Sequence, residues 1–236
     1  MWIKMKKKIF IIISVIVLIM VAFLAYIFIS DMIQEKKLQE EFSYIDGLME
    51  NEESQTDEIK EALNRNITKG DYLEVEKSYK QYLKDTFQNM EDITKVLDDE
   101  NIANILSKEN YQKDGPEFIN TKKYIEETRK SLEDGKNKYY ELLTKDGAMN
   151  YINNKDIDDY YKDLFKEEID KYVEKEEFND KTVDESLSDV IKLLNTAEKI
   201  INLLSENKNS WEIEDDSIVF ETQKLSDQYE ELTSEI

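Results

Sequence analysis

The stretch KMKKKIFIIISVIVLIMVAFLAYIFISD, from Lys4 to Asp31, decides how the rest of the chain is placed. Its apolar run from Ile9 to Ile29 contains 21 residues and no charge. A helix rises about 1.5 Å per residue, so a run of this length matches the ~30 Å hydrocarbon core of a bilayer. The sequence therefore predicts a transmembrane helix over residues 9–29.

A segment of this kind near an N-terminus is either a retained anchor or a secretion signal that is removed. A secretion signal has an apolar core of about 7–15 residues, followed by small residues at a cleavage site. This run is longer, and Ala22 and Ala25 lie inside it without the small-x-small spacing of such a site. The chain has no cysteine, so lipid attachment through a thiol is excluded. We predict a retained anchor, and a cleaved signal is the alternative.

The flanking lysines predict the orientation of the span. Four lysines precede it, whereas only Lys36 and Lys37 follow closely, among several acidic residues. Because basic flanks stay in the cytoplasm, residues 1–8 are expected to form a cytoplasmic tail. Residues 30–236 then form an extracytoplasmic domain of a single-pass protein of the cell membrane.

The charge of the outer part limits its partners. Beyond the span, 28 basic residues face 54 acidic ones, so this part carries a net charge of about −26. Such a surface repels nucleic acid phosphates and anionic lipid headgroups, and it favours cations, basic peptides or a positively charged protein. We expect no nucleic acid partner. The alternative explanation of the acidic surface is solubility alone.

The composition predicts an all-α fold. Five glycines and one proline in 236 residues leave little material for turns. Several amphipathic stripes follow the span, and an antiparallel bundle of four or five long helices is the simplest way to bury them. The use of lysine over arginine, with abundant isoleucine and asparagine, is typical of AT-rich bacterial genomes.

The spanning helix is expected to continue outward, because an apolar stripe repeats at helical spacing after it: Leu38, Phe42, Ile45 and Met49. The stripe resumes with Ile59, Leu63 and Ile67, and Gly70 is expected to cap its C-terminal end. Whether residues 50–57 continue the helix or kink it is left open by the sequence.

A second helix is predicted from Asp71, which with Glu74 resembles a capping box. Its stripe repeats every three or four positions: Val75, Tyr79, Tyr82, Thr86, Met90, Ile93 and Leu97. A short segment, Asn101 to Leu106, follows. The next stretch, SKENYQKDGPEF, is expected to be the longest loop, with Pro116 in the first turn of the following helix.

A heptad pattern predicts the next helix, which Gly147 is expected to close. Phe118, Ile125, Leu132 and Tyr139 recur every seven residues. The intervening positions are small or polar at Thr121, Thr128 and Gly135, before Leu142. Close approach of a neighbouring helix at Gly135 and a weakly packed stretch both explain this pattern.

Two further long helices are predicted before the C-terminal region. The first runs from Asp156 to Phe178 with a stripe of Ile157, Tyr161, Leu164, Phe165, Ile169, Tyr172 and Val173. The second opens with Thr182 and Glu185 as a capping box and carries Val183, Leu187, Val190, Leu194, Ala197, Ile201 and Leu204.

The stretch SWEIEDDSIVFE departs from helical spacing. Trp211 and Ile213 alternate with acids, as do Ile218 and Phe220 beyond Asp215-Asp216. A two-residue turn would pair Ile213 with Ile218 and Trp211 with Phe220, giving a small β-hairpin with one apolar face to lay on the bundle. An extended strap is the alternative, since the turn lacks glycine. A last short helix is expected, with the stripe Leu225, Tyr229, Leu232 and Ile236.

The chemistry that the chain can perform is restricted. It contains no histidine and no cysteine, which removes the usual base near neutral pH, the thiol nucleophiles and most transition-metal sites. Asn154, Asp156 and Asp158 alternate as in a calcium loop, but the glycine and glutamate of that pattern are missing, and helix capping by Asp156 explains them more simply. We expect a non-catalytic protein without cofactor or metal.

Binding residues are expected among exposed aromatics. Of the fourteen tyrosines, core packing is expected for five that lie on the core stripes: Tyr79, Tyr82, Tyr139, Tyr161 and Tyr172. Tyr140 and Tyr160 are the surface candidates. The apolar face of the hairpin supplies four more candidates: Trp211, Ile213, Ile218 and Phe220.

Two classes of function remain. The first is a membrane-anchored interaction or structural module at the cell surface, with a protein or cell-wall partner. The alternative is an extracytoplasmic sensor of a ligand or cation, or an accessory subunit of a larger membrane complex.

Overall fold

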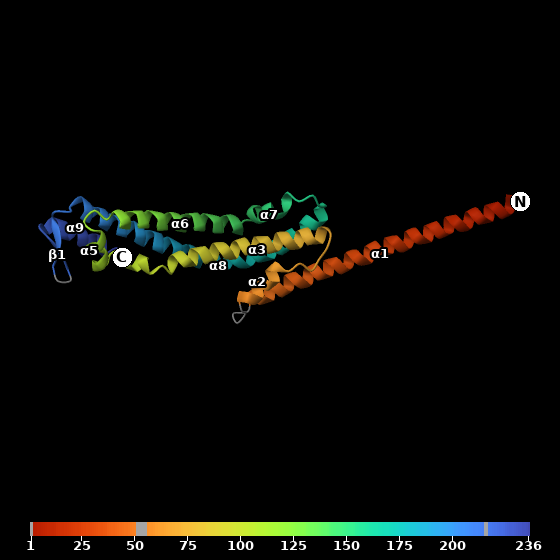
Figure 1. The fold of residues 1–236 in the computed structure, drawn as a ribbon, viewed down its shortest axis with the longest axis horizontal. Coiled ribbons are helices and arrows are strands. Elements are labelled where there is room, and N and C mark those ends of the chain that lie inside the picture. The colour runs from red at the N-terminus through yellow and green to blue at the C-terminus, as the bar shows by residue number, and fades with distance from the viewer. Residues whose placement is uncertain (1, 51–55, 215–216) are drawn as a thin grey trace. The chain divides into compact units, whose positions relative to one another are not determined.

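The computed structural model describes the backbone of residues 2–50, 56–214 and 217–236 (Figure 1). Within these ranges, the side chains of residues 2–16, 50, 56 and 174–182 are not described. The described part of the chain is helical apart from one antiparallel hairpin and its links. The elements are α1 Trp2–Glu50, α2 Thr56–Asn64, α3 Asp71–Leu97, α4 Glu100–Asn104, α5 Lys108–Asp114, α6 Ile119–Leu143, α7 Lys145–Asn153, α8 Asp159–Glu206, β1 Trp211–Glu214, β2 Ser217–Phe220 and α9 Gln223–Thr233.

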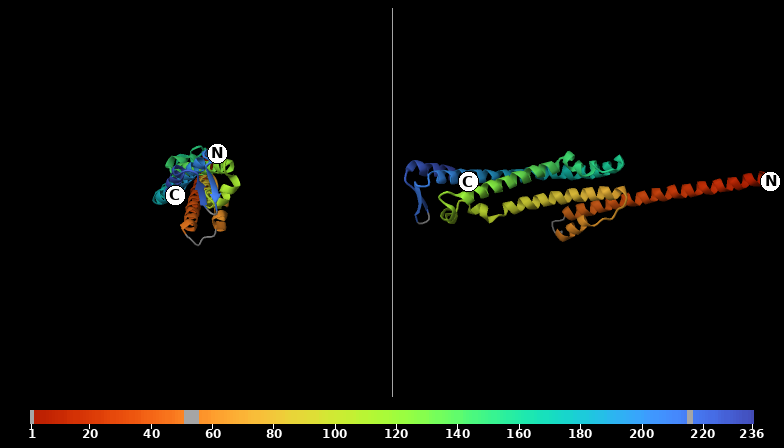
Figure 2. Two further views of the ribbon diagram at one scale, coloured as in Figure 1. Left: turned by 90° about the vertical axis from the view of Figure 1, so that its left-hand side faces the viewer. Right: turned by 45° about the horizontal axis from the view of Figure 1, so that its top comes forward.

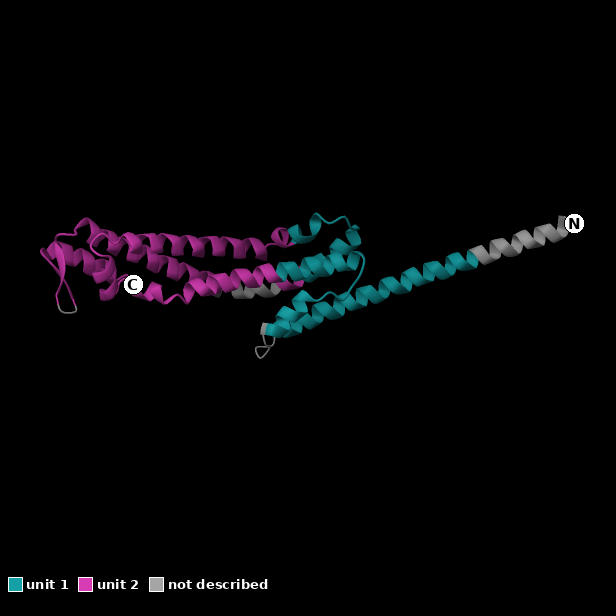
Figure 3. Cartoon of the chain, in the orientation of Figure 1, with its two compact units in different colours: residues 1–83, 149–168 teal, residues 84–148, 169–236 magenta. Residues whose placement is uncertain are grey.

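The chain divides into two compact units (Figure 3). Unit 1 contains residues 1–83 and 149–168, and unit 2 contains residues 84–148 and 169–236. Helices α3, α7 and α8 each contribute residues to both units, whereas α1 and α2 belong to unit 1 (Figure 3). Figure 2 shows the same helices in two further views.

Helix α1 is one continuous helix that passes from an exposed apolar half into a packed half. From Val17 to Ile29, its large apolar side chains are all exposed. This half is long and apolar enough to cross a membrane, although a secretion signal near an N-terminus has the same composition. The predicted outward continuation is confirmed, because Leu38, Phe42 and Ile45 are buried in unit 1. The question of a helix or kink over 50–57 falls largely on residues 51–55, which lie outside the described residues.

Helix α2 ends at Asn64, so the predicted helical stripe up to Gly70 is wrong at its end. Ile67 and Thr68 lie in a link, where their backbone N–H groups donate to the Glu76 carboxylate instead of to helical carbonyls. Gly70 adopts a left-handed φ of 63° directly before α3 and does not close the preceding helix.

Helix α3 follows the predicted stripe. Val75, Tyr79 and Tyr82 are fully buried in unit 1, where the Tyr79 ring packs 4.3 Å from that of Phe42. In unit 2, Thr86 and Ile93 are buried on the same helix.

The predicted loop from Ser107 to Phe118 is wrong, because it contains helix α5. The Ser107 side chain caps this helix by accepting a hydrogen bond from Asn110 N, and Tyr111 is buried in the core of unit 2. Pro116 does not open the next helix; it follows a cis peptide bond after Gly115, and α6 begins at Ile119.

Helix α6 buries both predicted seams, and the structure explains why the second one is small. Ile125, Leu132 and Tyr139 are buried, as are Thr121, Thr128 and Leu142. A Cβ atom at position 135 would lie only 2.8 Å from Ile93 Cγ1, so close approach of α3 favours Gly135 there. Gly147 does not close the helix: α6 ends at Leu143, and Gly147 lies within α7.

Residues 159–206 form a single helix, α8, where the sequence predicts two. The helix starts at Asp159, not Asp156, and its backbone stays helical past Thr182, so no new helix begins at the predicted capping box. The Thr182 side chain lies outside the described residues. No glycine or proline occurs between residues 159 and 206, and nothing in the local sequence therefore interrupts the helix.

The hairpin forms in the predicted register. Trp211 pairs with Phe220 and Ile213 pairs with Ile218, in antiparallel strands. All four side chains are partly buried and pack on the core of unit 2, while their strand neighbours are exposed. Residues Asp215 and Asp216 of the predicted turn lie outside the described residues. Helix α9 then follows, with Leu225 buried and Ile236 exposed beyond its end.

Candidate functional site

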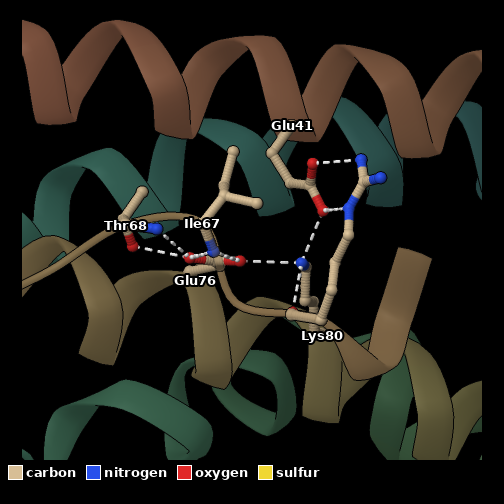
Figure 4. A network of polar contacts seen from close by, with 6 residues as sticks. Glu41, Ile67, Thr68, Glu76 and Lys80 are labelled. Carbon is tan, nitrogen blue, oxygen red and sulfur yellow. Dashed lines mark hydrogen bonds and ion pairs between the residues drawn. The ribbon is translucent and has the colours of Figure 1, made fainter. Parts of the chain in front are cut away.

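A network of charged side chains is buried in unit 1, where α1 meets α3 and the link after α2 (Figure 4). Glu41 comes from α1, Glu76 and Lys80 come from one face of α3, and Arg65 follows α2. The exposed fractions of Glu41, Glu76 and Lys80 are 2%, 0% and 2%. Charged residues this deeply buried are stable only when they are paired.

Lys80 lies at the centre of the network. Its Nζ donates to Glu41 Oε1 at 2.6 Å and to Glu76 Oε1 at 2.7 Å. A third hydrogen bond runs to the backbone carbonyl of Arg65 at 2.9 Å. An ammonium group has three N–H donors, and Lys80 uses all of them here.

Both carboxylates are satisfied as well. Glu76 accepts from Ile67 N and Thr68 N, and from Thr68 Oγ1 at 2.6 Å. Glu41 accepts two parallel bonds from Arg65, from Nε at 2.9 Å and Nη2 at 2.6 Å, the bidentate pairing that suits a guanidinium. The network contains two positive and two negative groups and is therefore neutral.

The pKa values of its groups follow from this geometry. Burial alone would raise the pKa of Glu76, but hydrogen bonds from Lys80 and Thr68 outweigh it and hold the pKa below its ordinary value. The hydrogen bond to Glu41 raises the pKa of Arg65. Glu76 and Arg65 are therefore held in their charged forms near neutral pH. This arrangement joins α1 to α3, and it offers no free base or nucleophile.

Unit 1 should lose stability in acid through Glu76. Its folded pKa lies below the unfolded value of about 4.3, so the stabilisation is fully present above that pH and is lost as the pH falls through the folded pKa. We measure the urea unfolding midpoint of the full chain in detergent by circular dichroism. Between pH 6 and pH 3 this midpoint should fall more steeply for the unmodified chain than for the Glu76→Gln variant. Equal slopes would show that Glu76 does not carry the effect.

The four predicted binding residues on the hairpin are brought together, on the side that faces their own core. Trp211 Nε1 donates to the carbonyl of Leu204 at 2.8 Å, and its ring stacks on Phe118 with centroids 6.0 Å apart. Ile213, Ile218 and Phe220 line a hollow of about 340 Å³ in unit 2. Tyr111 and Tyr229 also line this hollow, and its volume lies at the lower end of the size range of small-molecule pockets.

The two predicted surface tyrosines lie in different units. Tyr140 on α6 is partly buried, beside Tyr139, with Lys136 Nζ 5.8 Å from its ring centre. Tyr160 on α8 belongs to unit 1 and is 48% exposed. Neither tyrosine contributes to the hollow beside the hairpin.

The calcium-like residues Asn154, Asp156 and Asp158 lie in the link between α7 and α8. The predicted capping role of Asp156 is wrong in position, because α8 begins three residues later. Across the described residues, no group of three or more acidic side chains is arranged to hold a metal ion.

Sequence reasoning missed the buried network. One signal was present, since Glu76 and Lys80 are four residues apart on one helix, a spacing that allows an ion pair. Glu41 lies directly before Phe42 of the buried stripe. In a chain with 36% charged residues, however, such spacings are common.

Comparison of the chain with protein-family models, curated proteins and solved structures finds no match.

Proposed function

We propose that this chain is a membrane-anchored helical protein whose residues 30–236 lie outside the cytoplasm and serve as a non-catalytic interaction or structural module at the cell surface. The observation that carries the proposal is helix α1. From Val17 to Ile29 its large apolar side chains are all exposed on the protein, with Leu24 at 64% and Tyr26 at 70%, and the same helix then packs into unit 1.

Exposure of this half to water would be costly. Burying a large apolar side chain is worth roughly 1.5–3 kcal/mol, and every large apolar residue described between Val17 and Ile29 lacks such burial within the chain. A bilayer supplies the missing apolar environment. Because α1 is continuous, an anchor of this kind would be connected to unit 1 without a flexible joint.

The non-catalytic part of the proposal rests on the residue types and on the network. Without histidine and cysteine, acid–base or nucleophilic chemistry would have to use carboxylates, lysines or tyrosines. The buried carboxylates of Glu41 and Glu76 are engaged by Lys80, Arg65 and backbone N–H groups. They hold the helices of unit 1 together.

A second candidate is a sensor or accessory subunit of a membrane complex. It is favoured by the Glu41 ion pairs, which tie the helix that leaves the membrane to α3. A displacement of α3 would therefore move α1, and this is what a transmitting subunit requires.

Crosslinked co-purification of the tagged full chain from the membranes of cells that make it tests the interaction. The outward hairpin residues Glu212 and Glu214 are exposed, so reversing both to lysine alters the surface without disturbing the core face. We expect a stoichiometric protein or wall partner whose recovery falls at least about tenfold in this variant, a loss of about 1.4 kcal/mol.

The matched control replaces two exposed acids of α6, Glu126 and Glu127, by lysine. These substitutions change the net charge of the chain by the same amount as those on the hairpin. If partner recovery falls equally in both variants, the partner responds to the net charge of the chain and does not contact the hairpin. Recovery of the chain alone would contradict the interaction module and would direct the search to a soluble ligand or cation.

A further inference from the structure

Three tyrosines gather in unit 1 close to the point where α1 leaves its apolar half. Tyr72 of α3 packs edge-on against Tyr161 with ring centres 4.9 Å apart, and Tyr161 lies 5.3 Å from Tyr160 in the same edge-on manner. Tyr72 is 2% exposed and forms the base of the cluster. Tyr160 is half exposed and forms its outer surface.

Two acids of α1 act electrostatically on these tyrosines. Glu35 acts on both Tyr72 and Tyr160. Asp31 acts electrostatically on all three tyrosines. Asp71 and Asp158 add further negative charge beside Tyr161. The cluster is thus aromatic and strongly acidic.

The position of these acids along α1 gives the depth of the cluster. If Ile29 marks the edge of the hydrocarbon, a rise of about 1.5 Å per residue places Asp31 about 3 Å and Glu35 about 9 Å beyond it. The headgroup layer on each side is roughly 5–8 Å thick. Tyrosines on which Asp31 and Glu35 act electrostatically therefore lie near this layer, where tyrosines are enriched in membrane proteins.

We propose that Tyr160 and Tyr161, supported by Tyr72 and flanked by Asp31 and Glu35, form a contact surface for phospholipid headgroups that carry an ammonium group. This inference rests on the proposed membrane anchor and adds a second, specific contact with the bilayer.

The chemistry of the cluster selects this headgroup class. A tyrosine face attracts a quaternary or primary ammonium, and its hydroxyl donates to phosphate or ester oxygens. The carboxylates of Asp31 and Glu35 add attraction for the ammonium. An anionic headgroup without an ammonium would be repelled by the same acids.

The absence of cysteine allows a direct test with nitroxide labels on single cysteines introduced into the full chain. Asp159→Cys reports beside Tyr160, Leu24→Cys reports within the span, and Ser43→Cys is an exposed site on α1 about 21 Å beyond the hydrocarbon edge. Each labelled chain is placed in phosphatidylcholine vesicles and in phosphatidylglycerol vesicles. Collision with a water-soluble nickel chelate is measured by electron paramagnetic resonance.

In phosphatidylcholine we expect the Asp159 label to be protected from nickel, whereas the Ser43 label stays accessible. The protection should be about tenfold weaker in phosphatidylglycerol, equivalent to about 1.4 kcal/mol. Adding Tyr160→Ala should remove it, and adding Tyr140→Ala, on unit 2, should not.

The inference is overturned if the Asp159 label is as accessible as the Ser43 label, if both vesicles protect it equally, or if Tyr160→Ala has no effect. The Leu24 label separates this failure from that of the anchor. If Leu24 is protected while Asp159 is not, only the headgroup contact is wrong. If Leu24 is accessible too, the proposed anchor fails.

Discussion

Replacement of Lys80 by alanine lowers the free energy of unfolding of the chain by about 3–5 kcal/mol, because it leaves two buried carboxylates without their shared cation. Glu41 keeps Arg65 as a partner, but Glu76 loses its only ion pair among the described residues while it remains fully buried. The cost comes from the desolvated charge and not from lost packing alone. We expect the loss in urea titration of the full chain in detergent, followed by circular dichroism.

Lys77→Ala provides the matched control, three positions away on the same helix. Lys77 pairs with Glu74 at 3.4 Å on the surface, where such a pair contributes at most about 1 kcal/mol. A Lys80 variant as stable as the Lys77 variant would mean that the network does not hold α1 to α3. A double variant, Glu76→Gln with Lys80→Met, should be less destabilised than the sum of the single changes, since the two groups interact directly.

Replacement of Trp211 by alanine is expected to lower the free energy of unfolding by about 2–4 kcal/mol. This loss is somewhat smaller than that for a fully buried tryptophan, because the Trp211 side chain is only partly buried. The substitution removes the ring stacked on Phe118 and the edge contact with Tyr111, and it leaves the carbonyl of Leu204 without the Nε1 donor. Thermal unfolding and near-ultraviolet circular dichroism of the full chain in detergent measure this effect.

Val219 on the opposite face of the hairpin supplies the control, because it is 39% exposed. Val219→Ala should change stability by less than about 0.5 kcal/mol. If the two variants are equally stable, the hairpin does not belong to the core of unit 2, and Trp211 would be free to bind a partner. This comparison must precede any interpretation of binding lost in a Trp211 variant.

The sequence correctly predicts those helices and strands that a pattern of apolar residues within a short stretch defines. The alternation of Trp211 and Ile213 with acids predicts both the hairpin and its register, since a pleated strand places alternate residues on one face. The stripe of Leu38, Phe42 and Ile45 predicts the packed half of α1 in the same way.

The wrong predictions concern where helices begin and end, because a capping signal in the sequence is used at some positions and passed over at others. Thr182 and Glu185 form a good start signal, but a helix that is already formed continues through such residues at little cost. Ser107 is a good cap too, and it does begin α5 within a stretch that its polar composition predicts to be a loop. Sequence position alone does not decide which cap is used, because the burial of Tyr111 favours α5 through tertiary contacts.

The buried network was beyond sequence reasoning for a related reason. Glu41, Arg65 and Lys80 are far apart in the chain, and only the packing of α1 on α3 brings their charges together. Glutamate and lysine are also the commonest surface residues of a helical protein, so their burial has no local signature.

The most direct test of the anchored arrangement is the mass and sidedness of the chain in intact cells that make it. Single cysteines at Met5 and Glu212 are treated from outside with a membrane-impermeant maleimide, and the chain is recovered from the membrane fraction. Our account predicts an unprocessed chain of 28.1 kDa that is labelled at Glu212→Cys and is labelled at Met5→Cys only after lysis. A shortened chain released into the medium, or labelling of Met5→Cys in intact cells, would contradict it.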